Sequence, residues 1–301
     1  MTDQALPHSL SGGPFPAGAA PQRGPRRSRW REHSILPGFG LSLGITLTYL
    51  SLILILPLIA LAIRPWELGL SGVWAVLTEP RVMAALKLSF GLSAAAAFVN
   101  APIGLLIAWT LSRYRFPGQQ LLDAIVDLPF ALPTAVAGIA LTAIYAPNGP
   151  MGELAANVGI KTAYSPLGIF IALVFIGLPF VVRAIQPVLQ ELDHEVEEAA
   201  QTLGANSLQK AILVILPPLA PALVSGVSLA FARAVGEYGS VVFIAGNLPM
   251  KTEIAPLLIV MKLEEYNYAG AAAIGLAMLA ISFGVLVVVN GLQFILARRG
   301  R

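Results

Sequence analysis

Residues 167–185 read Leu-Gly-Ile-Phe-Ile-Ala-Leu-Val-Phe-Ile-Gly-Leu-Pro-Phe-Val-Val-Arg-Ala-Ile, an apolar run that contains one charged residue. A membrane-spanning helix needs about 20 consecutive, mostly apolar residues, so this run predicts one span. Five further runs of similar or greater length predict five more: Leu41–Ile63, Leu86–Leu111, Leu121–Tyr145, Ala211–Ile244 and Ala271–Leu296. The sequence therefore predicts an all-α, polytopic membrane protein with six transmembrane helices.

The composition of the whole chain agrees with this prediction. Of its 301 residues, 56% are hydrophobic and only 12% are charged, and the mean hydropathy is +0.77. These values are not those of soluble domains. A net charge of +3 indicates no nucleic-acid partner. The chain has no cysteine, and His8, His33 and His194 are too scattered to indicate a ligand set, so we expect no metal site and no cofactor in this chain.

The two ends of the chain differ from its apolar middle. Residues 1–38 are rich in Pro, Gly and Arg, a composition that cannot bury enough apolar surface to fold, and we expect a disordered cytoplasmic tail. The first apolar run is longer than that of a secretory signal, which favours an uncleaved first span. Residues 39–297 form the predicted transmembrane domain, with a cytoplasmic loop at 190–210, and residues 298–301 form a basic cytoplasmic end.

The distribution of Lys and Arg predicts the orientation, because positive residues accumulate on the cytoplasmic side of a membrane. With the N-terminus inside, the inner segments hold twelve Lys and Arg and the outer segments hold six. Both termini are therefore predicted to be cytoplasmic, and the long run Ala211–Ile244 should cross only once. The six outer residues are Arg64, Arg81, Lys87, Lys161, Lys251 and Lys262.

Prolines lie in or beside several of the apolar runs. Bilayer helices accept proline where neighbouring helices or water satisfy the freed carbonyls, so the pattern favours kinked helices around a cavity. Such an arrangement is typical of transport proteins. The prolines concerned are Pro102, Pro129, Pro133, Pro179, Pro217, Pro218 and Pro221.

The chain lacks the short motifs of common enzymes. No glycine loop of the required spacing precedes Lys161-Thr162 or Lys251-Thr252, so the chain has no phosphate-binding loop for ATP. Neither a Gly-x-Ser-x-Gly elbow nor a His-Glu-x-x-His helix occurs, and we expect no catalytic residue. Energy for transport must then come from a partner or an ion gradient.

The segment Glu191–Gly204 is too polar to cross a membrane and separates the fourth and fifth predicted spans. Leu192, Val196, Ala199 and Leu203 recur at helical spacing and form a narrow apolar stripe among five carboxylates. Gly204 fits a left-handed C-cap, and either Asn206 or Ser207 can cap the next helix. The segment predicts either a solvated acidic loop or, as we favour, a helix that docks in the groove of another protein.

The same segment resembles the cytoplasmic signature of ABC-importer permeases, Glu-Ala-Ala-x3-Gly-x9-Ile-x-Leu-Pro. Here the matching residues are Glu198, Ala199, Ala200, Gly204 and Val214-Ile215-Leu216-Pro217, and the valine is the only departure. Residues 128–138, 179–189, 233–247 and 251–254 further resemble the CysT-type permeases of sulfate/thiosulfate importers. The resemblance covers roughly residues 40–297.

The resemblance implies the type I ABC-importer permease fold, in the bacterial inner (plasma) membrane. It implies three protein partners: a cytoplasmic ABC ATPase, a sister permease subunit and an extracytoplasmic sulfate/thiosulfate-binding protein. It also implies that Glu198, Ala199, Ala200, Gly204 and Pro217 couple the spans to the ATPase, which performs all hydrolysis, so that this chain is not an enzyme.

Arg233 and Glu237 are the pair of opposite charges inside the fifth predicted span, at i and i+4. Ionisable groups in a bilayer are costly and usually face a cavity or each other. The pair therefore predicts either an ion pair that fixes packing or a cation that faces the anion path. Both readings stay open from the sequence.

Three alternatives to a sulfate/thiosulfate permease remain at this stage. Molybdate or tungstate permeases share the signature and carry tetrahedral oxyanions. A stand-alone ion-coupled anion transporter would need a relay of intramembrane acids, of which Glu237 is nearly the only candidate. A membrane-embedded enzyme would need a catalytic pair, which the sequence does not show.

Overall fold

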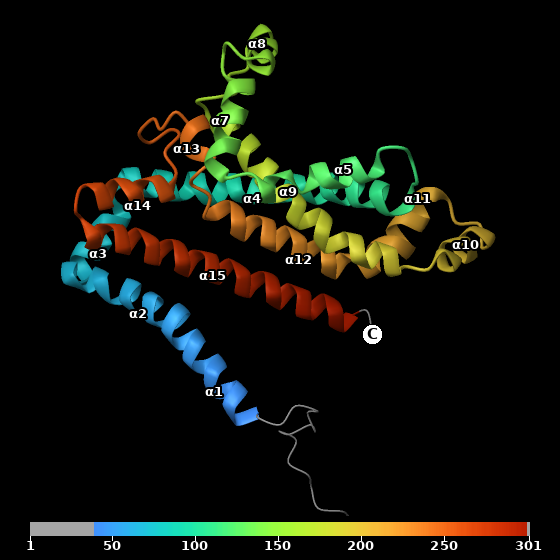
Figure 1. Ribbon diagram of the computed structural model, residues 1–301, viewed down its shortest axis with the longest axis horizontal. Helices are drawn as coiled ribbons and strands as arrows, with labels where there is room; N and C mark the ends of the chain where they lie inside the picture. The colour runs from blue at the N-terminus through green and yellow to red at the C-terminus, as the bar shows by residue number, and fades with distance from the viewer. Residues whose placement is uncertain (1–38, 300–301) are drawn as a thin grey trace, which may run out of the picture. The chain divides into compact units, whose positions relative to one another are not determined.

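The computed structural model describes residues 39–299; the predicted disordered tail, residues 1–38, and the last two residues of the basic end, 300–301, lie outside the described residues. The chain divides into two compact units: the first ends at Leu54 and the second begins at Ile55. Across the described range every regular element is a helix (Figure 1), as predicted.

The first predicted span, Leu41–Ile63, is helical throughout. It consists of α1 (Phe39–Leu50), a π-helical turn η1 (Ser51–Ile55) and α2 (Leu56–Ile63). A short 3-10 helix, η2 (Arg64–Leu68), and α3 (Gly69–Thr78) follow. Gly69, at the junction of η2 and α3, has a positive φ of 67°.

Three long helices form the centre of the second unit: α4 (Pro80–Arg113), α9 (Pro166–Glu191) and α12 (Leu216–Val235). They lie side by side in Figure 1, together with α15 (Tyr268–Arg299). The core between them is mainly apolar and includes the fully buried side chains of Val181, Ile185, Leu189 and Leu219. A second cluster, around Ile169, Leu173 and Ile244, lies beside it.

Five helical stretches in the described chain are long and apolar enough to cross a membrane: Phe39–Thr78, Pro80–Arg113, Pro166–Glu191, Ser207–Val235 and Tyr268–Val289. The third predicted span, Leu121–Tyr145, is therefore wrong as a continuous helix. It is divided into α5 (Gln119–Val126), α6 (Leu128–Ala131) and α7 (Thr134–Tyr145).

Two prolines explain this division. Pro129 lies in the first turn of α6, where its missing N–H is tolerated. Pro133 forces the preceding residue, Leu132, into an extended conformation with ψ of 133°, and helix α7 starts only after it. Helix α7 continues outward to α8 (Pro150–Asn157), which stands at its far end in Figure 1.

Most of the fifth predicted span, Ala211–Ile244, belongs to one long helix, but the predicted bounds were wrong; that this helix crosses the membrane once stays a prediction. The helix runs from Ser207 to Val235 through α11 (Ser207–Gln209), a π-helix η3 (Lys210–Ile215) and α12. It ends before Gly236, so Glu237 lies beyond the helix rather than within it. Of the remaining predicted residues, only Val241–Ile244 are helical and form α13; α14 (Ala255–Glu264) then precedes α15.

Two ion pairs mark the opposite ends of α4. At one end Arg81 donates to both carboxylate oxygens of Glu253, at 2.9 and 2.6 Å, and at the other Arg113 contacts Glu197 at 2.7 Å. The first pair joins two segments predicted to be outside, and the second joins two segments predicted to be inside. The contacts therefore agree with the predicted grouping of loops; which side is cytoplasmic stays a prediction.

Candidate functional site

The polar segment between α9 and α12 folds as a helix, a turn and a second helix, as predicted. Helix α10 runs from His194 to Thr202. Gly204 has φ of +84° and donates its N–H to the Gln201 carbonyl, while Ala205 donates to the Ala200 carbonyl. These two bonds form a Schellman motif, which satisfies carbonyls at the helix end. The left-handed C-cap predicted at Gly204 is confirmed.

Asn206, rather than Ser207, caps the following helix. Its side chain accepts a hydrogen bond from the Gln209 backbone N–H at 2.8 Å, and the Gln209 side chain accepts one from the Asn206 N–H at 2.9 Å. This reciprocal pair is a capping box. The turn between α10 and the long fifth helix is thus fixed at both sides by local bonds.

One face of α10 is attached to the end of α4. The Arg113 guanidinium contacts the Glu197 carboxylate at 2.7 Å and donates to the Leu192 carbonyl at 3.2 Å. Leu192 itself packs against the main core. The predicted apolar stripe is therefore divided, because its first residue faces inward.

The remainder of the stripe is open. Val196 is 48% exposed and Leu203 is 88% exposed, and Ala199 and Glu198 are also exposed. Ala200 is half-buried, and Pro217 is exposed near the start of α12, on the helix that follows rather than on α10. A short helix with an uncovered apolar edge of small residues has the form of a docking element.

Arg233 and Glu237 form the ion pair that the sequence left as one of two readings. Arg233 Nη1 lies 2.6 Å from Glu237 Oε2; the Glu237 side chain is 1% exposed and that of Arg233 is 36% exposed. The other oxygen of Glu237 accepts hydrogen bonds from the backbone N–H and the hydroxyl of Ser240. The carboxylate thus fixes the turn after α12, and the guanidinium stays partly open.

This turn lies against the start of α7. A Cβ added at Gly138 would lie 2.4 Å from the Ser240 carbonyl oxygen and 2.7 Å from the Ser240 Cα, so only glycine fits there. Gly138 and Ser240 belong to residues 128–138 and 233–247, two of the stretches that carry the resemblance. The fold brings these two separate stretches into direct backbone contact.

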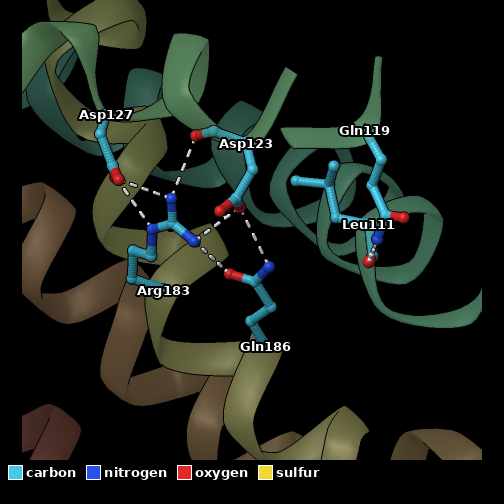
Figure 2. A network of polar contacts seen from close by, with 6 residues as sticks. All are labelled: Leu111, Gln119, Asp123, Asp127, Arg183 and Gln186. Carbon is cyan, nitrogen blue, oxygen red and sulfur yellow. Dashed lines mark hydrogen bonds and ion pairs between the residues drawn. The ribbon is translucent and has the colours of Figure 1, made fainter. Parts of the chain in front are cut away.

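A polar network that the sequence analysis missed lies between α5, α6 and α9 (Figure 2). The Arg183 guanidinium donates to both carboxylate oxygens of Asp127, at 2.8 and 2.6 Å, and to Asp123 Oδ1 at 2.7 Å. Gln186 bonds both Arg183 and Asp123. The network attaches the broken third segment to α9.

A signal for this network was present in the sequence. Asp123 and Asp127 lie in one predicted span and Arg183 in another, and intramembrane charges of opposite sign tend to pair. The two aspartates are four residues apart, on one face of a helix. The sequence does not say which cation meets them, because that depends on how the spans pack.

Comparisons with known proteins extend these observations. Residues 100–301 match the family of binding-protein-dependent transport system inner membrane components. The chain is 50% identical over 265 residues to the sulfate transport system permease protein CysT of Salmonella typhimurium, covering 88% of this chain and 96% of that protein. The CysT protein of Synechocystis is 49% identical over 249 residues, which cover 83% of this chain and 87% of that protein.

Solved structures share the fold at low identity. The crystal structure of a bacterial ABC transporter for import of the acidic polysaccharide alginate superposes with a TM-score of 0.69, at 15% identity, over 84% of this chain and 93% of that one. An inward-facing MetNI methionine ABC transporter superposes with a TM-score of 0.56, at 16% identity, over 72% of this chain and 96% of that one. These likenesses show the fold of an ABC-transporter permease.

Proposed function

The chain belongs to the family of binding-protein-dependent transport system inner membrane components, and from this premise we propose that it is the permease subunit of an ATP-driven importer of sulfate or thiosulfate. It is a multi-pass transport subunit of the inner membrane. The observation that carries the choice of anion is the 50% identity to sulfate permeases over nearly their whole length.

A separate ABC ATPase supplies the energy in this proposal. The exposed edge of α10 supports docking of the ATPase onto this helix. Val196, Ala199 and Leu203 are uncovered, and the exposed Glu198 can meet a basic group of the ATPase. Among the described residues no ion pair involves Glu198. Gly204 sets the angle of α10, and the ion pair of Arg113 with Glu197 transmits its movement to α4.

The other partners follow from the same assembly. A sister permease of similar fold completes the anion path, and an extracytoplasmic sulfate/thiosulfate-binding protein delivers the anion to the outer side. This chain carries no cofactor and no catalytic group in the proposal. Arg233 and Glu237 are proposed to border the path, where the partly exposed guanidinium favours a divalent anion.

Uptake in reconstituted vesicles tests the proposal. The assembled transporter, with ATP inside and the binding protein outside, should accumulate labelled sulfate, and unlabelled thiosulfate should compete. Molybdate should compete weakly, which separates this proposal from the molybdate/tungstate alternative. Uptake that needs an ion gradient but no ATPase would overturn it.

A further inference from the structure

A cavity of about 560 Å³ lies beside α10, and the function proposed above assigns no ligand to it. Its walls come from the C-terminal part of α4 and Tyr114 after it, from α11, η3 and the start of α12, and from one side chain of α10. The cavity is therefore built entirely within one compact unit of the chain.

The lining combines apolar and polar side chains. Leu105, Leu106 and Leu219 contribute the apolar part, whereas Ser207 and Lys210 contribute polar groups. Trp109 and Tyr114 also line it. A small inorganic anion would leave the leucine wall uncovered, and a purely apolar molecule would leave the lysine without a partner. An amphipathic ligand fits both parts.

The position of the cavity along α4 indicates the membrane surface. A helix of 34 residues is about 50 Å long, and the hydrocarbon core of a bilayer is only about 30 Å thick. The final turns of α4, from Trp109 to Arg113, therefore lie at the level of the lipid headgroups. Trp and Tyr are enriched at this level, which agrees with Trp109 and Tyr114 in the lining.

Of the charged side chains that line the cavity, Glu197 has a partner of opposite charge and Lys210 has only a neutral one. The carboxylate of Glu197 is neutralised by Arg113 at 2.7 Å, and the Arg113 guanidinium also lies 5.5 Å from the centre of the Trp109 ring. Lys210 donates to the neutral side chain of Gln201 at 3.2 Å, and within the described residues no carboxylate lies within ion-pair distance of it. Lys210 is thus a half-buried cation with a neutral partner.

We propose that this cavity binds one anionic phospholipid. An acyl chain lies along Leu105, Leu106 and Leu219, and the phosphate meets Lys210. Basic pockets between helices at the membrane surface bind lipid headgroups for this reason. The site adjoins both α10 and the ion pair of Arg113 with Glu197, so the bound lipid would stabilise the position of the docking helix. This inference does not depend on which anion is transported.

Native mass spectrometry of the full transporter, released from mild detergent, tests the proposal. Preparations are incubated with phosphatidylglycerol or phosphatidylcholine of identical acyl chains, or with inorganic phosphate, and bound lipid is counted. Phosphatidylglycerol should be retained in preference to phosphatidylcholine. Lys210→Gln should weaken its retention about fivefold, the effect of about 1 kcal/mol for one lysine near an anionic surface.

Two further variants keep the test specific. Lys87→Gln removes the same charge from an exposed position in the other half of α4 and should retain phosphatidylglycerol normally. Ala211→Trp places a large side chain at an exposed residue of the lining and should reduce retention of both lipids while Lys210 stays intact.

Several results would overturn the proposal. These are equal retention of the two lipids, equal losses in Lys210→Gln and Lys87→Gln, and displacement of phosphatidylglycerol by millimolar inorganic phosphate. A photo-crosslinker at Leu106 should label lipid; a crosslink to another protein chain instead would show that a protein covers this cavity.

Discussion

The guanidinium of Arg113 lies 2.7 Å from the carboxylate of Glu197, and this contact joins the last residue of α4 to the middle of α10. The two side chains are only 7% and 18% exposed. A short, largely exposed polar helix is thereby attached to α4, the helix of 34 residues. Movement of α10 cannot leave α4 unaffected while this contact holds.

The first prediction concerns this contact. Glu197→Gln should lower the melting temperature and reduce ATP-driven uptake, because a hydrogen bond to a charged, largely buried group is worth about 1.5–3 kcal/mol. The matched control is Glu195→Gln, which changes an exposed carboxylate on the same helix. Thermal unfolding and sulfate uptake of both variants provide the measurement. Equal behaviour of the two variants would show that the contact has no role in coupling.

The second prediction concerns the turn after α10. Gly204 has φ of +84°, a conformation that costs an L-residue about 1–2 kcal/mol and a β-branched residue more. Gly204→Val should leave the spans inserted but uncouple ATP hydrolysis from uptake. Gly204→Asn should retain most coupling, since asparagine tolerates this region. ATPase activity and uptake are measured on the same preparation, and normal coupling in the valine variant would refute the assignment.

The third prediction concerns the network of Figure 2. Arg183→Gln leaves Asp123 and Asp127 without their shared cation, so backbone hydrogen exchange in residues 119–131 should accelerate. Arg183→Lys should have a smaller effect, because the charge remains while the bidentate fork is lost. The groups are about one-third to one-half exposed, so the change in melting temperature should be modest. Unchanged exchange in the glutamine variant would exclude the network as the attachment of α5 and α6 to α9.

The fourth prediction separates charge from packing at Arg233 and Glu237. Removing one partner leaves the other charge uncompensated, at a cost of up to about 3–5 kcal/mol for a fully buried pair and less here, because Arg233 is partly exposed. In the double variant Arg233→Met with Glu237→Gln, the glutamine carbonyl can still accept the hydrogen bonds from Ser240. Folding should therefore recover.

Transport in that double variant decides between the two roles. If Arg233 attracts the anion, the double variant should assemble with the ATPase and still transport poorly, and Arg233→Lys should retain part of the uptake. Sulfate uptake per assembled complex is the measurement. Wild-type uptake by the double variant would leave Arg233 with a purely structural role.

The fifth prediction concerns the contact of α7 with the turn before α13. Gly138→Ala places a methyl group 2.4 Å from the Ser240 carbonyl oxygen, so the backbones must separate, and overpacking of this kind costs about 1–3 kcal/mol. Gly284→Ala is the control, because a methyl group added there has no atom within 4 Å. The melting temperature should fall only for the first variant. A comparable fall in both would mean that the contact at Gly138 contributes nothing specific.

The sequence by itself determined the helical class, the membrane location and the local structure of the polar segment. Apolar runs of span length allow little else, because a bilayer leaves backbone groups no partner outside a helix or closed barrel. The turn around Gly204 and Asn206 was predictable because its hydrogen bonds join residues at most five apart. The signature Glu198-Ala199-Ala200 could also be recognised in the sequence, because its residues are consecutive.

Only the tertiary structure decided how the charges pair and where two of the predicted spans end. Arg81 with Glu253, Arg113 with Glu197, and Arg183 with Asp127 join residues far apart in the chain, and no periodicity specifies such partners. The apolar run at 121–145 looked continuous, yet its two prolines divide it into short helices. Arg183 on α9 then holds the first of these helices through Asp123, a contact that the sequence did not specify. Glu237 lies beyond the end of α12, where its carboxylate accepts hydrogen bonds from Ser240, and the close approach of Gly138 on α7 to Ser240 joins residues about one hundred positions apart, which no sequence pattern specifies.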